Sequence, residues 1–289
     1  MTDLRYECPE TIEAAVAMLG AEGPKAKVFA GGTDLLVQMK EQLIEPSLLI
    51  DLKKIAETRK IAFEKDVVRI GAAVTGAEMG ENDKLKAMWP GVVEAVELIG
   101  SYQIQGRATM GGNLCNASPA ADSVPALIAA DARVVIAGPN GTREVAVEKF
   151  PTAPGKTCLD KGEFVVSILL PIPPKHSGDA YLRFIPRTEM DIAVVGAGVA
   201  MTLDGKGTCT AARMSLGAVS ATAQLVEPAA NILIGNKLTD AVLESLADVA
   251  RKACKPIDDK RGTIKFRTQV AGVLACRAAK IAWQRAEKN

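Results

Sequence analysis

Short apolar runs alternate with helical spacing of apolar residues at the start of the chain, a pattern typical of a β-α-β-α-β unit. Apolar residues recur at helical spacing from Ile12 to Leu19, and Gly20 and Gly23-Pro24 end this helix. The pattern then predicts a strand over residues 28–30, a helix over 34–42 and a strand over 48–52. We expect this first unit to span residues 1–53.

The next stretch, residues 54–177, is predicted to mix strands and helices. Thr75 and Glu78 have the spacing of a capping box and predict a helix start, and Trp89-Pro90-Gly91 interrupts the helical pattern. Pro139-Asn140-Gly141 predicts a hairpin turn. The other predicted elements are strands over 67–72, 133–137, 144–147 and 164–170 and helices over 92–99 and 126–130.

The last stretch, residues 178–289, is predicted to form an antiparallel sheet followed by helices. Three apolar runs are separated by turn signals, of which Asp204–Gly207 is typical of a hairpin. The predicted strands cover 181–185, 193–203 and 208–217, and the predicted helices cover 221–233, 240–254 and 264–286. The chain is therefore expected to be an α+β protein.

Two glycine-rich stretches, Ala30–Leu35 and Thr109–Asn113, carry the candidate chemistry. Each places a Gly-Gly pair beside small polar side chains, so that backbone N–H groups can approach a ligand closely. Successive N–H groups form a concave nest that suits phosphate oxygens. The first stretch lies between a predicted strand and a predicted helix, whose N-terminus favours an anion. Two such loops predict one long ligand whose diphosphate is held from both sides.

A third glycine-containing stretch, Val195–Met201, contains GxG but does not read as a dinucleotide fingerprint. The third glycine, the helix start and the acidic ribose partner are all missing. We interpret its glycines as packing positions of a central strand.

Composition excludes several classes of function. Of 289 residues 48% are hydrophobic, and 35 Lys and Arg against 34 Asp and Glu leave a net charge of +1, so no nucleic-acid partner is expected. The segment 1–7 lacks the apolar core of a signal peptide, and no apolar run reaches the roughly 20 residues of a membrane span. The six cysteines are scattered, without the spacing of a zinc or iron–sulfur site. A cytoplasmic location with reduced thiols is expected.

The single histidine, His176, argues against hydrolase chemistry. It lies in a segment rich in proline and polar residues, 173–178, and is interpreted as a solvated turn residue. A Ser-His-Asp or Cys-His arrangement would depend on it alone.

Taken together, the motifs resemble those of the FAD-binding medium subunit of the molybdenum hydroxylases, a family that includes xanthine dehydrogenase and carbon monoxide dehydrogenase. The resemblance covers the whole chain and rests on Ala30–Leu35, Thr109–Leu114, Ala117–Ser123 and Arg187–Ala193. It implies a two-part FAD-binding module of the vanillyl-alcohol-oxidase type, residues 1–53 and 54–177, followed by an α+β C-terminal domain, residues 178–289.

The resemblance also implies which residues hold FAD. Those residues are Phe29, Ala30, Gly31, Gly32, Thr33, Asp34, Leu35, Leu36, Ile99, Gly100, Thr109, Gly111, Gly112, Asn113, Asp122, Ile168, Leu169 and Arg183. Residues 29–36 and 109–113 resemble the pyrophosphate loops, with hydroxyl donors at Thr33 and Thr109. Ile99 and Gly100 would line the adenine or flavin cavity.

The remaining residues would meet the flavin. Asp122 would bind its ribityl chain or ring edge, and the strand of Ile168 and Leu169 would reach the ring through its backbone. Arg183 stands where some relatives have a lysine, so its contact with the flavin stays open. Other readings also stay open: Thr109 as a helix cap, Asp122 as an N-cap and Arg183 as a surface charge.

The resemblance further implies non-covalent FAD as the only redox centre of this chain, although Cys115 is a conceivable attachment point. The molybdenum cofactor would lie on a large partner subunit and two-iron clusters on a small iron–sulfur subunit, in a dimer of heterotrimers. Electrons would pass from the iron–sulfur subunit to FAD and on to an external acceptor. The alternatives are a stand-alone FAD oxidase of the same wider fold and a scaffold that has lost FAD. An oxidase would need an acid–base side chain at the flavin, for which the chain offers one histidine and three tyrosines.

Overall fold

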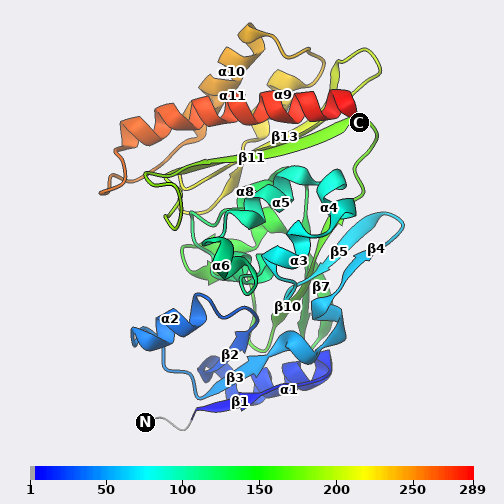
Figure 1. Cartoon of the computed structure of the whole chain (residues 1–289). Coiled ribbons are helices and arrows are strands. Elements are labelled where there is room, and N and C mark those ends of the chain that lie inside the picture. Colours follow the sequence, from blue (N-terminus) through cyan, green and yellow to red (C-terminus); the bar gives the residue numbers. More distant parts are fainter. Residues whose placement is uncertain (1–3) are drawn as a thin grey trace.

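The computed structural model describes residues 4–289, and its three larger sheets are stacked with their helices along one axis (Figure 1). Residues 1–3, where the predicted first unit and the segment 1–7 begin, lie outside the described residues. The long C-terminal helix crosses the top of the view, and the strands nearest the N-terminus lie at the bottom. Within residues 4–289, no helix combines the length and apolar character needed to cross a bilayer.

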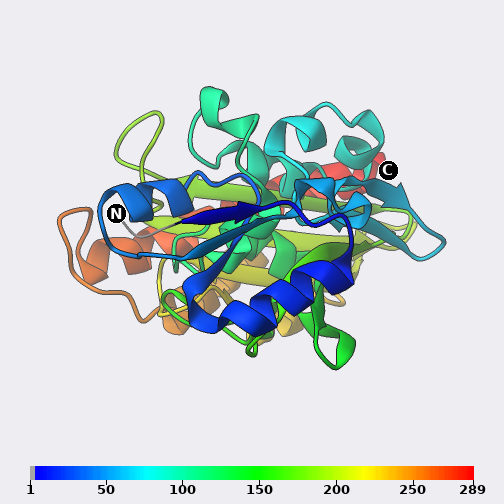
Figure 2. The same cartoon turned by 90° about the horizontal axis from the view of Figure 1, so that it is seen from below.

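The first sheet confirms the predicted β-α-β-α-β unit. Its order is β1-β3-β2, with both pairs parallel. The elements are β1 (Arg5–Glu7), α1 (Ile12–Glu22), β2 (Ala26–Phe29), α2 (Leu35–Lys40) and β3 (Leu48–Asp51). Figure 2 shows α1 beside this sheet. Because β2 ends at Phe29 and α2 begins at Leu35, the first glycine motif forms the strand-to-helix turn that the sequence predicts.

The middle of the molecule is a five-stranded antiparallel sheet of order β4-β5-β10-β6-β7. Its strands are β4 (Ile61–Phe63), β5 (Val67–Gly71), β6 (Arg133–Gly138), β7 (Gly141–Ala146) and β10 (Phe164–Pro171), and β8 (Pro151–Ala153) pairs with β9 (Lys156–Thr157). The central strand β10 is buried on both faces, as its continuous apolar run predicts.

Six short helices accompany this sheet. They are α3 (Gly76–Gly80), α4 (Asp83–Met88), α5 (Pro90–Glu97), α6 (Tyr102–Gln105), α7 (Met110–Cys115) and α8 (Ser123–Ala129). The capping box of Thr75 and Glu78 is confirmed at the start of α3. The break at Trp89 is confirmed as well, although α5 already begins at Pro90, a position that suits the fixed φ of proline.

The third sheet has the order β11-β12-β13-β14 and is antiparallel. The elements are β11 (Ser177–Phe184), β12 (Val195–Leu203), β13 (Cys209–Gly217), β14 (Gln224–Leu225), α9 (Glu227–Leu233), α10 (Asp240–Ala253) and α11 (Ile264–Lys288). The predicted helix over 221–233 is wrong in its first half. Gln224 and Leu225 pair with β13 instead, and Pro228 in the first turn starts the helix after them.

The glycines of β12 are packing positions, as interpreted from the sequence. A Cβ on Gly198 would lie 2.6 Å from the carbonyl oxygen of Pro125, so α8 of the middle unit packs directly on this strand. The Ser215 hydroxyl donates to the same carbonyl. A bulkier residue on β12 would therefore separate the third sheet from the middle unit.

A buried carboxyl lies at this contact and gives the protein a pH dependence. Asp179 on β11 is 4% exposed, and its Oδ2 accepts the N–H of Val92 at 3.0 Å, at the start of α5. Its Oδ1 has no hydrogen-bond partner within residues 4–289. Burial raises the pKa of Asp179 to about 7, although the hydrogen bonds from α5 and the nearby Arg285 oppose the shift and Glu94 adds to it.

We expect the free energy of unfolding to fall as the pH rises from about 4 to about 7. The folded-state pKa lies above the ordinary value of 3.8, so ionisation of Asp179 is easier in the unfolded chain. The loss is on the order of 4 kcal/mol. In denaturant titrations across this range, Asp179→Asn should flatten the dependence and be more stable at pH 8. Asp66→Asn, at an exposed turn, is the matched control. An unchanged pH profile in Asp179→Asn would contradict the assignment.

Candidate functional site

A cavity of about 380 Å³ lies where the first two units meet, and both glycine motifs line it. Ligand pockets typically enclose 300–1,000 Å³, so the size suits an organic cofactor. Of the sequence-predicted residues, it is lined by Ala30, Gly31, Gly32, Thr33, Asp34, Leu35, Ile99, Thr109, Gly111, Gly112 and Asn113. The prediction that two loops far apart in the chain meet at one ligand-sized space is confirmed.

The first motif is a tight turn with unpaired N–H groups. Within residues 4–289, no protein oxygen accepts the N–H of any residue from Gly31 to Leu35. Gly32 has a φ of +73°, and a Cβ there would lie 2.3 Å from the ring of Phe29. Phe29 thus supports the turn from beneath, outside the cavity lining. Its ring in turn packs against the Lys53 ammonium, 4.3 Å from the ring centroid.

Lys53 fixes the entry to this turn. Its Nζ donates to the carbonyl oxygen of Ala30 at 3.0 Å and lies 2.8 Å from the carboxylate of Asp51. The hydroxyl of Tyr6 donates to the same carboxylate oxygen, Oδ2 of Asp51. These contacts hold the chain where β2 ends, so that the following N–H groups face the cavity as a preformed set.

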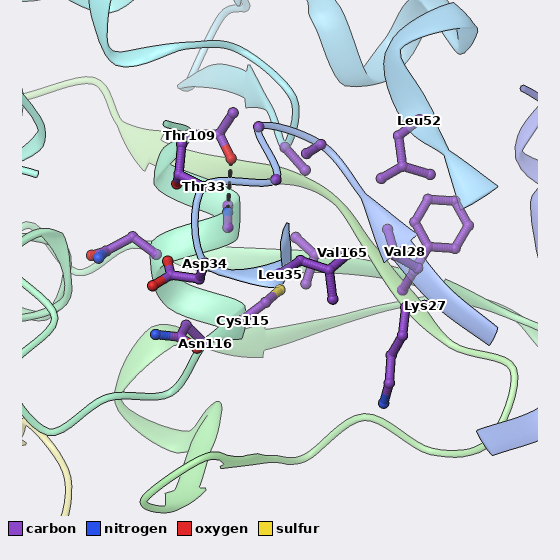
Figure 3. A pocket seen from close by; sticks show the side chains of 18 of the residues that line it. Lys27, Val28, Thr33, Asp34, Leu35, Leu52, Thr109, Cys115, Asn116 and Val165 are labelled. Carbon is purple, nitrogen blue, oxygen red and sulfur yellow. Dashed lines mark hydrogen bonds between the residues drawn. The ribbon is translucent and has the colours of Figure 1, made fainter. Parts of the chain in front are cut away.

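The second motif is a helical turn rather than a loop. Thr109 caps α7: its hydroxyl oxygen accepts the N–H of Gly112 at 2.9 Å, the dashed line in Figure 3. The interpretation of Thr109 as a helix cap is therefore confirmed. Its hydroxyl proton remains free to donate to a ligand. Within residues 4–289, the N–H groups of Met110 and Gly111 have no acceptor. A Cβ on Gly111 would lie 2.6 Å from the carbonyl oxygen of Ala72, so glycine lets α7 approach β5.

Most of the polar side chains labelled in Figure 3 gather on one side of the cavity. The figure shows Thr33, Asp34, Thr109 and Asn116 toward the left of the view, Val165 near the middle, and Val28, Leu52 and the charged Lys27 toward the right. The surrounding protein raises the pKa of the Asp34 carboxyl, although its side chain is open to the cavity. A carboxylate is an acceptor only, so it suits a ligand hydroxyl.

The two motifs are also tied to one another. Gln38 on α2 donates from Nε2 to Oδ1 of Asn116 at 3.3 Å, a contact that joins α2 to the end of α7. Asn113 accepts the Ser123 hydroxyl at 2.7 Å and so links α7 to α8. The Asn113 amide group keeps its two N–H donors for the cavity.

Cys115 lines the cavity, so its side chain is accessible from the cavity space and is enclosed by protein elsewhere. Burial raises the pKa of its thiol to about 12, and Cys158 contributes to the shift. The nucleophilic form of cysteine is the thiolate, so this thiol is unreactive near neutral pH. His176 lies in the exposed turn before β11, as predicted, and does not line the cavity.

Seven predicted residues lie outside the cavity lining. They are Phe29, Leu36, Gly100, Asp122, Ile168, Leu169 and Arg183. Asp122 occupies the N-cap position of α8, but its carboxylate makes no capping hydrogen bond to the helix. The surface reading of Arg183 is wrong, since its side chain is 7% exposed.

Asp122 and Arg183 instead form a buried ion pair between the middle and C-terminal units. Arg183 donates from Nη1 to Oδ2 at 2.7 Å, and the Tyr181 hydroxyl donates to Oδ1 at 3.0 Å. Burial raises the pKa of Asp122 to about 6 against the opposing effect of Arg183 and Tyr181, so the carboxyl group is ionised at neutral pH. The predicted contacts of Asp122 and Arg183 with the flavin stay predictions.

Several lining residues were missed from the sequence. The apolar and small ones include Val28, Leu52, Ala72, Leu159, Phe164 and Val165, and the polar ones include Lys27, Gln38, Asn116 and Glu163. Lys27 and Gln38 flank the first motif, so its neighbourhood was a usable signal. Glu163 directly precedes β10 and Val165 lies at its start, and only the packing of that strand brings them here.

The donor set fits the diphosphate of FAD. Six backbone N–H groups without protein acceptors, those of Gly31–Leu35 and of Gly111, belong to residues that line one cavity, and the N–H of the neighbouring Met110 also has no acceptor. Such N–H groups bind anions when they converge. Gly31, Gly32 and Gly111 leave the backbone accessible there, since they have no side chain. A Cβ on Gly31 or Gly111 would collide with a backbone oxygen.

Comparison with known proteins decides the family. A family described as "FAD binding domain in molybdopterin dehydrogenase" matches residues 2–173, and one described as "CO dehydrogenase flavoprotein C-terminal domain" matches residues 180–282. The chain belongs to the FAD-binding medium-subunit family of the molybdenum hydroxylases. The expected fold, two-part FAD-binding module and α+β C-terminal domain, is confirmed with it.

Individual relatives agree with this assignment. The medium subunit is 34% identical to the carbon monoxide dehydrogenase medium chain of Hydrogenophaga pseudoflava over 280 residues, 97% of each chain. It is 29% identical to the nicotinate dehydrogenase FAD-subunit of Eubacterium barkeri, over 94% of each chain. A solved structure of Cu,Mo-CO dehydrogenase has 33% identity and a TM-score of 0.93, covering 98% of each chain.

Proposed function

We propose that this medium subunit is the electron-transfer subunit of a molybdenum hydroxylase complex. It would receive electrons from a small two-iron iron–sulfur subunit and pass them from its FAD to an external acceptor. A large subunit with the molybdenum cofactor would oxidise the substrate. The observation that carries the proposal is the cavity with two facing sets of backbone N–H donors, in a chain similar along its length to medium chains of such enzymes.

The residues of the cavity would bind and orient the cofactor. N–H groups of Gly31–Leu35 and of Met110 and Gly111 would hold the diphosphate, and the Thr109 hydroxyl would donate to it. Asp34 would accept from a hydroxyl group. FAD, when bound, exchanges electrons singly or in pairs, which the side chains themselves cannot do. The protonated thiol of Cys115 supports non-covalent binding.

The cavity favours the electron-transfer role over a stand-alone oxidase. Within residues 4–289, its lining includes no histidine and no tyrosine, and its Glu163 is engaged by Arg143 at 2.7 Å. Its remaining carboxyl group, Asp34, is assigned here to a hydroxyl group of the cofactor. A substrate-oxidising site would need a free acid–base group at the flavin.

We also propose a cytoplasmic location, a dimer of heterotrimers, and boundaries between the three units of the chain at 53/54 and 177/178.

Reconstitution and copurification test the proposal. The purified chain should bind FAD and release it on acid precipitation, and it should oxidise no organic substrate by itself. Expressed with its native partners, it should copurify with two further chains that carry iron and molybdenum. A chain that takes up no flavin would contradict the FAD assignment. A flavin chain that oxidises a substrate alone, without partner chains, would establish the oxidase alternative instead.

A further inference from the structure

A second, smaller cavity lies behind the first glycine motif. It encloses about 220 Å³ and is lined by Ala30, Gly31, Lys53, Arg59, Ala73, Thr75, Gly106, Arg107 and Thr109, and we refer to it as the rear cavity. Ala30, Gly31 and Thr109 also line the cofactor cavity, so they form a shared wall. The family assignment gives the rear cavity no role.

The rear cavity carries an excess of positive charge. Lys53 is paired with Asp51 and Arg59 with Glu78, at 2.8 and 2.6 Å. Arg107 is an exposed residue of the lining and has no acidic partner within residues 4–289. Its guanidinium group has five N–H donors arranged as a planar fork, a geometry that suits an oxyanion.

The donors that belong to the rear cavity alone are cationic. Lys53, Arg59 and Arg107 line it and do not line the cofactor cavity. Gly31 and Thr109 line both cavities, and their N–H and hydroxyl donors are assigned to the FAD diphosphate. A water molecule takes about 30 Å³, so 220 Å³ holds a phosphate-sized ion together with several waters.

We propose that the rear cavity binds a phosphate-sized oxyanion, with Arg107 as its principal ligand. The anion would lie across the wall formed by Ala30, Gly31 and Thr109 from the FAD diphosphate. Like charges at such a distance repel, so each ligand would weaken the binding of the other. The linkage to FAD rests on the proposed function, whereas binding of the anion does not.

Calorimetry with inorganic phosphate at constant ionic strength, balanced with chloride, tests the site. Phosphate should bind both the flavin-free and the FAD-loaded chain, and roughly several-fold more weakly to the latter. Arg107→Gln should weaken it about ten-fold or more in both forms, since a charge-assisted bond is lost. Arg277→Gln, at an exposed position on α11, is the matched control and should leave the phosphate affinity of both the flavin-free and the FAD-loaded chain unchanged.

The outcomes separate the two sites. Phosphate that binds only the flavin-free chain occupies the diphosphate site, and that result would overturn the proposal. Binding that is equal in Arg107→Gln and in the wild type would also overturn it. If the chain takes up no FAD but phosphate binding still depends on Arg107, the rear cavity stands and the proposed function fails. A parallel titration with ribose 5-phosphate shows whether the ion binds free or as a monoester: comparable binding that depends on Arg107 would support a monoester site.

Discussion

Replacing Gly31 with alanine is expected to abolish FAD binding at micromolar concentrations. A Cβ at this position would lie 2.0 Å from the backbone carbonyl oxygen of Arg107 and 2.8 Å from its carbonyl carbon. Neither atom belongs to a flexible side chain, so one of the two backbone segments must move. Overpacking of this kind costs about 1–3 kcal/mol, and displaced N–H donors cost further affinity. The dissociation constant should rise on the order of 100-fold.

Flavin fluorescence quenching measures that constant, and circular dichroism shows whether the variant is folded. Gly20→Ala is the matched control, because a Cβ on Gly20, within α1, meets nothing within 4 Å. The control should bind FAD normally and be slightly more stable, since alanine favours a helix. If folded Gly31→Ala binds FAD as tightly as the wild type, the motif does not hold the diphosphate.

Replacing Asp122 with asparagine is expected to destabilise the protein by about 3–5 kcal/mol, the usual cost of breaking a buried ion pair. Arg183 would keep its charge with its side chain only 7% exposed and would lose its carboxylate at 2.7 Å. The Tyr181 hydroxyl would lose a charged acceptor as well. Denaturant unfolding at pH 8 should show a lower midpoint, because the pair joins the middle unit to the C-terminal sheet.

Two comparison variants distinguish stability from cofactor binding. Glu144→Gln breaks the ion pair between Glu144 and Arg133, whose side chains are 44% and 54% exposed. It should lower the free energy of unfolding by less than about 1 kcal/mol. The double variant Asp122→Leu with Arg183→Met removes both charges and should regain most of the lost stability. Normal FAD binding by this double variant would contradict the predicted flavin contacts of Asp122 and Arg183. If Glu144→Gln destabilises the protein as much as Asp122→Asn does, the distinction between buried and exposed ion pairs is wrong.

Local signals predicted the elements that depend on neighbouring residues. The capping box at Thr75, the hairpin turn at 139–141 and the buried run of β10 all follow from spacing and turn chemistry. The predicted helix over 221–233 is wrong in its first half because Gln224 and Leu225 pair with Leu216 and Ser215 of β13. This pairing depends on the hydrogen bonds of the preceding strand, which the spacing of apolar residues within 221–233 does not report. The glycines of the second motif indicated a loop in the sequence, because glycine disfavours a helix. The structure has the helix α7 instead, and its Gly111 must be a glycine because its backbone lies so close to Ala72.

The sequence by itself determined the family, the cofactor class and the two motifs that border the cofactor cavity. Short motifs do so because their backbone conformation is set locally, by glycine and by the residues that cap a turn. Only the tertiary structure decided that Asp122 and Arg183 pair and that Arg107 lines a cavity behind Gly31. Both depend on which segments, distant along the chain, come together on folding. Asp122 and Arg183 share a buried space, where desolvation makes an unpaired charge costly and so favours the pair.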